Sequence, residues 1–226
     1  MRYMNSQSFT AGYEREISPK LNLMPEYNNK ADYLGSWQFQ TKVSASLKVA
    51  SNEREIIELY ESGENLIGLQ GGDLYESLGG RGVGERAGNE GTVGLKLDLG
   101  QLVIGKSNYL FASYCKISKP LKPWYTIWVV NSPIIGHRRI SPKSHPSDGL
   151  LDIVEFSLSF RQSKKAYKRA KSGDHLPHPQ IKTSKKRTYM IKERGKRKVV
   201  IDGKKIAYSK EISISIIPHA IAVVLL

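Results

Sequence analysis

From residue 95 to the C-terminus the sequence has one β-strand pattern after another, and this succession limits the fold more than any other feature. Ile212–Ile216 alternates strictly between apolar and polar residues, and Trp124–Val130 is rich in aromatic and β-branched residues. Gly203-Lys204, directly after Asp202, predicts a hairpin turn, and one helix is expected over Gln162–Lys171. We therefore expect a β-sandwich over 95–226, with strands at Leu95–Leu99, Gln101–Ile104, Tyr109–Ser118, Trp124–Asn131, Leu151–Ser159, Ile181–Thr183, Arg187–Lys192, Lys198–Ile201, Glu211–Ile217 and Ile221–Leu226.

Residues 1–94 have a different pattern. Thr41–Leu47 predicts a strand, Ser51–Tyr60 a short helix with an acidic first turn, and Leu66–Leu69 a buried strand that ends at a glycine turn. Residues 1–38 are expected to be irregular, and the glycine-rich stretch 79–94 is expected to form a loop. The predicted fold class is therefore α+β and β-rich. A reduced α/β, nucleotide-binding-like portion over 1–94 precedes the β-sandwich over 95–226, whose last strand can pack back on the first portion.

The composition is that of a globular chain with a large excess of positive charge. Its 226 residues are 39% hydrophobic, and it has no run of about 18 apolar residues that could span a membrane. Cys115 is the only cysteine, which excludes an internal disulfide and fits a reducing cytoplasm. The formal net charge is +14, and residues 161–198 hold fifteen Lys and Arg against only Asp174 and Glu193. Such a segment attracts anionic membranes, nucleic acid or nucleotide phosphates, unless it is a solvated, lysine-rich surface.

Five short motifs along the chain contain the polar residues of interest. Taken singly, each has a plain structural explanation. Asp148 can bond the amides of its own Asp-Gly turn, Asp73 can cap a helix over Leu74–Leu78, and Asp98 can end a strand. The motifs are QGGDLYESLG at Gln70–Gly79, LDLG at Leu97–Gly100, SHPSDGLLD at Ser144–Asp152, GDHLPHP at Gly173–Pro179 and VVIDGK at Val199–Lys204.

In this order and spacing the motifs resemble the diacylglycerol-kinase-like lipid kinases of the NAD kinase and diacylglycerol kinase superfamily. The resemblance extends from Leu66 to Leu226, and the chain is similar to short members that retain mainly the C-terminal β-domain. The resemblance implies ATP and Mg²⁺ as cofactors, the latter bound by oxygen ligands. The implied phosphate-binding residues are Gly71, Gly72 and Asp73, and the implied Mg²⁺ ligands are Asp148, Asp98 and the backbone oxygens of His145 and Leu150.

Two departures from the family pattern concern catalysis. The family has Asp-Gly-Glu in the hairpin near its C-terminus, where the Glu acts as general base, whereas this chain has Lys204 after Asp202 and Gly203. A protonated lysine has no acceptor atom and cannot take the proton of a lipid hydroxyl. The family's Gly-Gly-Asp-Gly-Thr phosphate loop also has no counterpart before Gly68, although phosphoryl transfer depends on holding the phosphates in place.

The resemblance and its departures together predict a degenerate lipid-kinase-like protein, a pseudokinase with weak or no ATP-dependent phosphorylation of a lipid hydroxyl. One alternative is an active Mg-ATP-dependent lipid kinase with carboxylates from Asp73, Asp98 or Asp202 and a homodimer that completes the site. Another is a basic module that binds an anionic membrane or nucleic acid. Nucleic acid is less favoured because only Tyr167 and Tyr189 can stack on bases within 161–198. The expected location is the cytoplasm, at the inner surface of the membrane.

Overall fold

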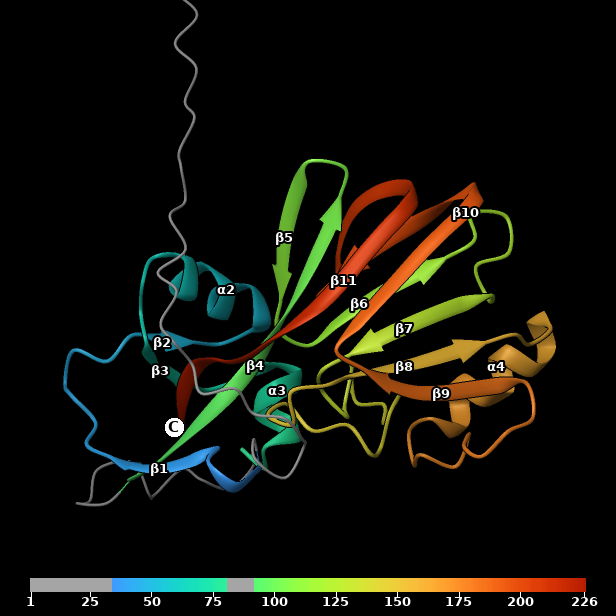
Figure 1. Cartoon of the computed structure of the whole chain (residues 1–226). Coiled ribbons are helices and arrows are strands. Elements are labelled where there is room, and N and C mark those ends of the chain that lie inside the picture. Colours follow the sequence, from blue (N-terminus) through green and yellow to red (C-terminus); the bar gives the residue numbers. More distant parts are fainter. Residues whose placement is uncertain (1–33, 81–91) are drawn as a thin grey trace, which may run out of the picture.

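The computed structural model describes residues 34–80 and 92–226, and within these ranges most of the chain is strand. The elements are β1 (Gln38–Thr41), β2 (Val49–Ala50), α2 (Glu53–Glu61), β3 (Leu66–Leu69), α3 (Gly72–Ser77), β4 (Thr92–Ile104), β5 (Ser107–Phe111), β6 (Tyr114–Ser118), β7 (Thr126–Val130), β8 (Leu151–Phe156), α4 (Phe160–Arg169), β9 (Ile181–Lys186), β10 (Thr188–Ile201) and β11 (Lys204–Leu225). Hydrogen bonding follows the order β1-β4-β11-β10-β6-β7-β8-β9, with β2, β3 and β5 attached beside this path (Figure 1). The predicted α+β, β-rich fold class is confirmed.

The sequence pattern places several strand ends wrongly: the expected strand Tyr109–Ser118 is two strands, β5 and β6, and β9 continues past the expected end at Thr183 to Lys186. β4, β10 and β11 each run through two segments that the pattern predicts as separate strands. β11 continues past Pro218 because it bulges there: its register against β4 shifts between Ile217 and Ile221, and His219 adopts a φ of 48°. A bulge is one of the few places where a sheet accepts proline, because that residue donates no ladder hydrogen bond.

The core of the sandwich is formed by alternate residues of its strands. Because successive side chains of a strand point to opposite faces, every second residue of β6, β10 and β11 faces inward. Apolar area that leaves water in this way is the main stabilising term of such a fold. The buried members of this core are Leu102, Phe111, Cys115, Ile117, Val129, Leu151, Ile153, Ile191, Val199, Ile201, Ile212 and Ile214.

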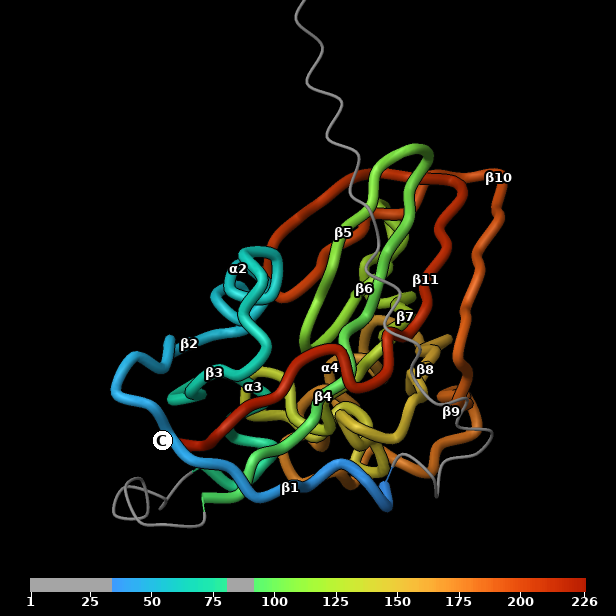
Figure 2. Tube along the Cα trace, turned by 60° about the vertical axis from the view of Figure 1, so that its left-hand side comes forward, coloured from blue at the N-terminus to red at the C-terminus, as the bar shows by residue number. Residues whose placement is uncertain are grey.

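The N-terminal elements are joined to the sandwich by its longest strands. β3 pairs in parallel with β2 and with the end of β11, where Ala222 lies opposite Leu66. Figure 2 shows this end of β11 among the N-terminal elements. The expected division after residue 94 falls inside β4. The expected strand at Thr41–Leu47 is wrong: β1 ends at Thr41, and the residues from Lys42 to Leu47 form no strand.

Helix α4 covers the outer face of β7 and β8. It begins with a capping box between Ser159 and Gln162, two residues earlier than the pattern predicts, and buries Ala166 and Ala170 against Trp128 and its neighbours. None of the helices within the described ranges is long and apolar enough to cross a bilayer. Of the segments expected to be irregular or loop-forming, residues 1–33 and 81–91 lie outside the described residues.

Candidate functional site

A cleft of about 690 Å³ lies where the outer face of the sandwich meets α2 and α3. Alternation along β6 decides which side chains reach it. Cys115 and Ile117 are fully buried in the sandwich core. Tyr114, Lys116 and Ser118 therefore point to the opposite face, where they line the cleft.

Neighbouring strands add to this wall by the same rule. Lys198 and Val200 of β10 line the cleft, and they pair across the strands with Ser118 and Lys116 of β6. On the other side of β6, Lys116 pairs with Trp128 of β7, and its Nζ lies 4.7 Å from the centre of the Trp128 ring. This distance permits a cation–π contact, so strand register brings a cation and an aromatic ring together in the cleft.

Positive charge in the cleft is not neutralised by ion pairs. Within 34–80 and 92–226, no acidic side chain pairs with Lys116, Arg138, Lys198 or Lys205, all of which line the cleft. Burial lowers the pKa of Lys116, and the positive charge of Lys198 lowers it further. The Nε of Arg138 is buried and has no acceptor among the described residues. An anionic group would reduce the repulsion between the lysines and give Arg138 an acceptor.

The hairpin between β10 and β11 confirms the predicted turn. The carboxylate of its residue Asp202 is held in place by hydrogen bonds. Asp202 and Gly203 have φ angles of 40° and 82°, which a tight two-residue hairpin requires. The Asp202 carboxylate accepts the backbone N–H groups of Ala112, Ser113 and Tyr114 at 2.7, 3.1 and 2.8 Å. Desolvation by the surrounding protein nevertheless raises the pKa of Asp202 to about 7. Its carboxylate fixes the chain between β5 and β6.

Lys204, at the position for which the resemblance implies a general base, lies outside the cleft. Its exposed side chain borders a neighbouring pocket of about 360 Å³, together with Arg54 and Glu58 of α2. The pocket and the cleft share only the turn residue Asp202 and Lys205. Lys204 therefore provides neither a base nor a phosphate ligand within the cleft in this arrangement.

The glycine turn before α3 is occupied by a carboxylate from α2. Glu53 Oε1 accepts the N–H of Leu74 at 3.0 Å. A Cβ on Gly72 would lie 2.4 Å from the same oxygen, and a Cβ on Gly71 would lie 2.5 Å from the backbone oxygen of Ser51. Gly71 thus has a packing reason to be glycine, and Gly72 has a conformational one, because its φ is 92°. Phosphate binding by Gly71, Gly72 and Asp73 stays a prediction.

Asp73 does not cap α3, contrary to the plain structural explanation for this residue. The helix begins at Gly72 without a side-chain cap from its own N-terminus. Instead, Asp73 Oδ1 accepts the N–H of Gly136 at 2.8 Å, and Oδ2 lies 3.5 Å from Ser113 Oγ. Burial raises the pKa of Asp73, and the charge of Glu76 adds to this rise. Asp73 therefore connects α3 to the loop after β7 at the edge of the cleft.

Asp98 joins three segments that are far apart in the sequence. It is fully buried on β4, where its carboxylate accepts the N–H of Gly149 at 2.8 Å and the N–H of His219 at 2.7 Å. Its own N–H donates to the backbone oxygen of Pro146 at 2.7 Å. Burial raises the pKa of Asp98 to about 7, against the two hydrogen bonds that lower it. Asp98 therefore holds the Ser144–Asp152 turn against the bulge of β11.

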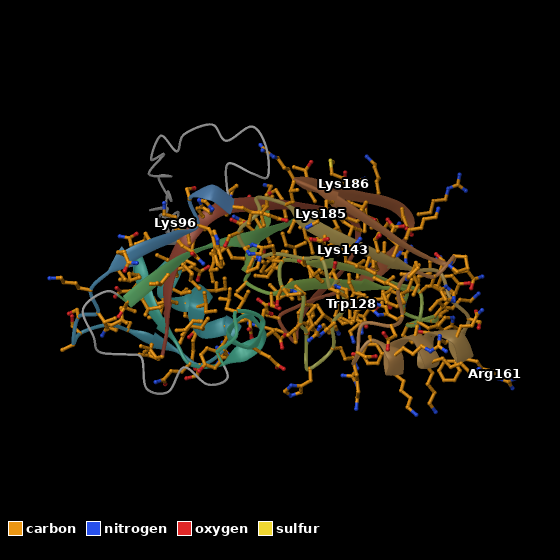
Figure 3. The ribbon with its side chains drawn as sticks, turned by 90° about the horizontal axis from the view of Figure 1, so that it is seen from below. Lys96, Trp128, Lys143, Arg161, Lys185 and Lys186 are labelled. Carbon is orange, nitrogen blue, oxygen red and sulfur yellow. The ribbon has the colours of Figure 1, made fainter. Side chains whose placement is uncertain are left out.

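Asp148 is held by a lysine. Lys185 of β9 (Figure 3) places its Nζ 2.8 Å from Asp148 Oδ2 and 2.7 Å from Asp152 Oδ2. Burial opposes the charge of Lys185, but these hydrogen bonds outweigh it and raise the pKa of the ammonium. The other oxygen of Asp148 accepts the N–H of Leu150 at 3.1 Å. Both carboxylates already have a cation between them.

The remaining implied metal ligand also has local partners. The ring of His145 lies edge-on against Trp37 with centres 4.8 Å apart, and its backbone oxygen accepts the N–H of Asp148 at 3.4 Å. Among the residues that the structure describes, no three His, Cys, Asp or Glu side chains gather as metal ligands would. As arranged, the donors do not fit a Mg²⁺ ion, because Lys185 stands in its place. Metal binding by Asp148, Asp98, His145 and Leu150 stays a prediction.

The sequence reasoning overlooked the residues that give the cleft its charge. Lys116 lies between the buried Cys115 and Ile117, and Lys198 precedes the buried Val199, so both lysines occupy polar positions in the alternating segments YCKIS and KVVI. Glu53 gave no such signal. It has the ordinary position of an acidic residue in a first helical turn, and only the packing of α2 against α3 brings it to the glycine turn.

Comparison with known proteins agrees with this fold. The YegS C-terminal NAD kinase beta sandwich-like domain matches residues 119–225. The fold resembles a diacylglycerol kinase from Bacillus anthracis str. Sterne, with 13% identity, a TM-score of 0.51, and coverage of 75% of this chain and 80% of that one. A second structure from that organism, a candidate diacylglycerol kinase, has 12% sequence identity and a TM-score of 0.51. The match covers 76% of this chain and 82% of that one.

No curated protein sequence matches the chain. The resemblance inferred from the motifs is nevertheless confirmed by the domain match, which covers three of them in whole or in part. At the identities found, the two solved structures show a shared fold. Residues 119–225 match the YegS C-terminal NAD kinase beta sandwich-like domain, and the chain shares its fold with the two solved diacylglycerol-kinase-like structures.

Proposed function

We propose that this chain is a degenerate lipid-kinase-like protein, whose cleft binds a phosphate-bearing ligand and transfers phosphate weakly or not at all. The observation that carries this proposal is the hairpin at Asp202-Gly203-Lys204. A general base needs a free carboxylate within hydrogen-bond reach of the substrate hydroxyl. The carboxylate of Asp202 accepts three backbone N–H groups, and Lys204 has no acceptor atom.

The glycine turn supports the same conclusion. In phosphoryl transfer, the protein contributes mainly by positioning the phosphates and neutralising their charge. Here the Glu53 carboxylate lies against Gly72 and takes the N–H of Leu74. A carboxylate in this position repels the phosphates of ATP at short range. The chain therefore lacks both a free base and an open phosphate turn at the positions that the resemblance implies.

The cleft retains the features of an anion-binding site. Lys116 and Lys198 face it with mutual repulsion, and Arg138 presents a buried N–H that has no acceptor within 34–80 and 92–226. The rings of Trp128 and Tyr167 stand beside these cations, at 4.7 Å from Lys116 Nζ and 4.2 Å from Arg138 Cζ. A ligand with a phosphate group and an apolar portion fits this combination. Phosphorylated lipids have both, and so do nucleotides.

An active kinase with rearranged groups is the second candidate, and two carboxylates favour it. Glu53 and Asp73 both line the cleft, and burial raises the pKa of each. Raised carboxylate pKa values are common among catalytic bases. If one of them is the base, catalysis depends on that carboxylate and not on position 204.

Incubation of the purified chain with labelled ATP, Mg²⁺ and diacylglycerol in mixed micelles tests the proposal. We expect label in phosphatidate at the level of the protein-free blank, both for the natural chain and for Lys204→Glu. Turnover near the ordinary enzymatic range of about 1 s⁻¹ or more would overturn the proposal. Loss of that turnover in Asp73→Ala or Glu53→Gln would then support the second candidate.

Ligand binding is measured separately by the rise in melting temperature. We expect dioctanoyl phosphatidate to stabilise the chain, because a ligand bound only by the folded state must do so. Lys116→Met and Lys198→Met should each reduce this shift, whereas Lys210→Met, an exposed lysine of β11, should not. The rise in melting temperature is also measured with ATP in the absence of lipid. A shift with ATP alone would identify the ligand as a nucleotide, and no shift with either would contradict phosphate binding in the cleft.

A further inference from the structure

Exposed apolar side chains surrounded by cations lie beside the mouth of the cleft. Leu121 is 91% exposed and Phe160 is 63% exposed. The ring of Trp124 lies edge-on against that of Phe160, with centres 5.5 Å apart. This contact joins the loop between β6 and β7 to the first residue of α4. We name these three residues, together with the neighbouring cations, the docking face; its cations are Lys119, Lys122, Arg161, Lys164 and Lys168.

The direction of the docking face follows from how α4 packs. Ala166 and Ala170 are buried against the sandwich. Because helical residues repeat every 3.6 positions, Arg161, Lys164 and Lys168 lie on the opposite side and are exposed. Figure 3 shows Arg161 on α4 at the outer end of the molecule, far from Lys96. Residues 157–173 include no Asp or Glu, so this segment carries charge of one sign.

We propose that the docking face binds the surface of an anionic phospholipid bilayer. The lysines and arginines are attracted to anionic headgroups, and each such charge strengthens binding about fivefold. Leu121, Trp124 and Phe160 can leave water by entering the boundary between headgroups and acyl chains, where tryptophan is especially common. The cations and the apolar residues therefore act on the same partner.

The loop that presents Leu121 is stiffened for this role. Pro120 and Pro123 flank the segment Leu121-Lys122, and proline restricts the backbone before any binding occurs. Less conformational freedom is then lost when the loop enters the bilayer surface. A nucleic acid would use the lysines of this face, but it offers an isolated, protruding leucine no apolar medium to enter.

The location of the docking face connects it to the cleft. Lys116, Pro123, Trp128 and Tyr167 line the cleft, and the same four residues line an adjoining groove that contains Trp124 and Phe160. A bilayer on this face would therefore lie next to the entrance of the cleft. The docking does not depend on which ligand the cleft binds, so it can hold or fail independently of the proposed function.

Vesicle flotation with the full chain tests the docking face. The chain is mixed with vesicles of phosphatidylcholine alone or of phosphatidylcholine with phosphatidylglycerol, and each is measured across a series of salt concentrations. We expect binding to the anionic vesicles only, weakening as salt rises. Trp124 fluorescence should shift to shorter wavelength on binding, and this shift should be absent in Trp124→Phe. Binding of a duplex oligonucleotide is measured across the same series of salt concentrations.

Paired variants separate this face from the rest of the surface. Leu121→Asp should weaken binding to anionic vesicles about tenfold, whereas Met190→Asp, at a residue that is 72% exposed on β10, should leave it unchanged. Lys164→Met with Lys168→Met removes two positive charges and should weaken binding about thirtyfold, and the same change at Lys42 and Lys48 should have little effect. Circular dichroism confirms that each variant is folded. The proposal would be overturned if a control variant lost as much vesicle binding as the docking-face variant with which it is paired. It would also be overturned if the chain bound neutral vesicles as well as anionic ones, or if it bound the oligonucleotide but no vesicles.

Discussion

The ammonium of Lys185 lies 2.8 Å from the carboxylate of Asp148, in the turn for which the family resemblance implies Mg²⁺. Asp148 is fully buried, and Asp152 is nearly so. Removing the cation would leave two carboxylates together in a desolvated site. We expect Lys185→Met to lower the free energy of unfolding by roughly 3 kcal/mol, the usual effect of breaking a buried ion pair. Urea denaturation at neutral pH measures it.

Lys186→Met is the matched control, because Lys186 is the next residue on β9 and is exposed. It should change the free energy of unfolding by less than about 0.5 kcal/mol. If Lys185 replaces a metal, Mg²⁺ should raise the melting temperature of Lys185→Met and not that of the natural chain, relative to KCl at equal ionic strength. An equal rise in both proteins would show that Mg²⁺ binds despite Lys185.

Asp98 should contribute to the pH dependence of stability, as Asp202 does, because burial raises the pKa of both. Burial raises the pKa of Asp98 to about 7, whereas an unfolded Asp titrates near about 4. The folded state thus holds this proton more tightly, so its contribution to stability is full below about pH 4 and is lost as pH rises through about 7. Between these values, the free energy of unfolding should fall less in Asp98→Asn than in the natural chain. Asp174→Asn, at an exposed residue, should keep the natural slope; an unchanged slope in Asp98→Asn would contradict this prediction.

Much of the fold could be predicted because its strands follow local patterns. Leu66–Leu69 and the Asp202-Gly203 hairpin were both found from sequence and lie where expected. The long strands could not be found in this way. Pro218 and Gly100 interrupt the local pattern of β11 and β4, yet pairing between the two strands continues through Gly100 and resumes at Ile221 after the bulge at Pro218. Propensity describes single segments, whereas the neighbouring strand supplies the stabilising hydrogen bonds.

The candidate site was less predictable, because its decisive contacts join distant residues. The turn at Asp148 was visible in the sequence, but the lysine that holds it comes from 37 residues later. Glu53 reaches Leu74 over 21 residues. A carboxylate motif indicates where charge is placed, and only the packing of other elements decides whether that charge faces a ligand or a lysine of the same chain.

Gly100 should be required by packing. It pairs with Phe111 across β4 and β5, and a Cβ at Gly100 would lie 2.0 Å from the Phe111 ring. Because Phe111 is fully buried, its ring has little room to move. Gly100→Ala should therefore destabilise the chain by about 1 to 3 kcal/mol. Gly195→Ala on β10 is the control, since its Cβ would meet nothing within 4 Å. Similar melting temperatures for the two variants would refute the packing explanation.

Glu53 should control how closely phosphate can approach the glycine turn. Glu53→Gln keeps an oxygen that can accept the N–H of Leu74 but removes the negative charge beside Gly72. Losing one repulsive charge at about 4 Å in water-like surroundings is worth about 1 kcal/mol, or about fivefold in affinity. Isothermal titration with Mg-ATP should thus show tighter binding to Glu53→Gln than to the natural chain. Glu58→Gln, on the exposed side of the same helix, should bind as the natural chain does. Equal affinity in all three proteins would mean that the phosphates of ATP do not reach this turn.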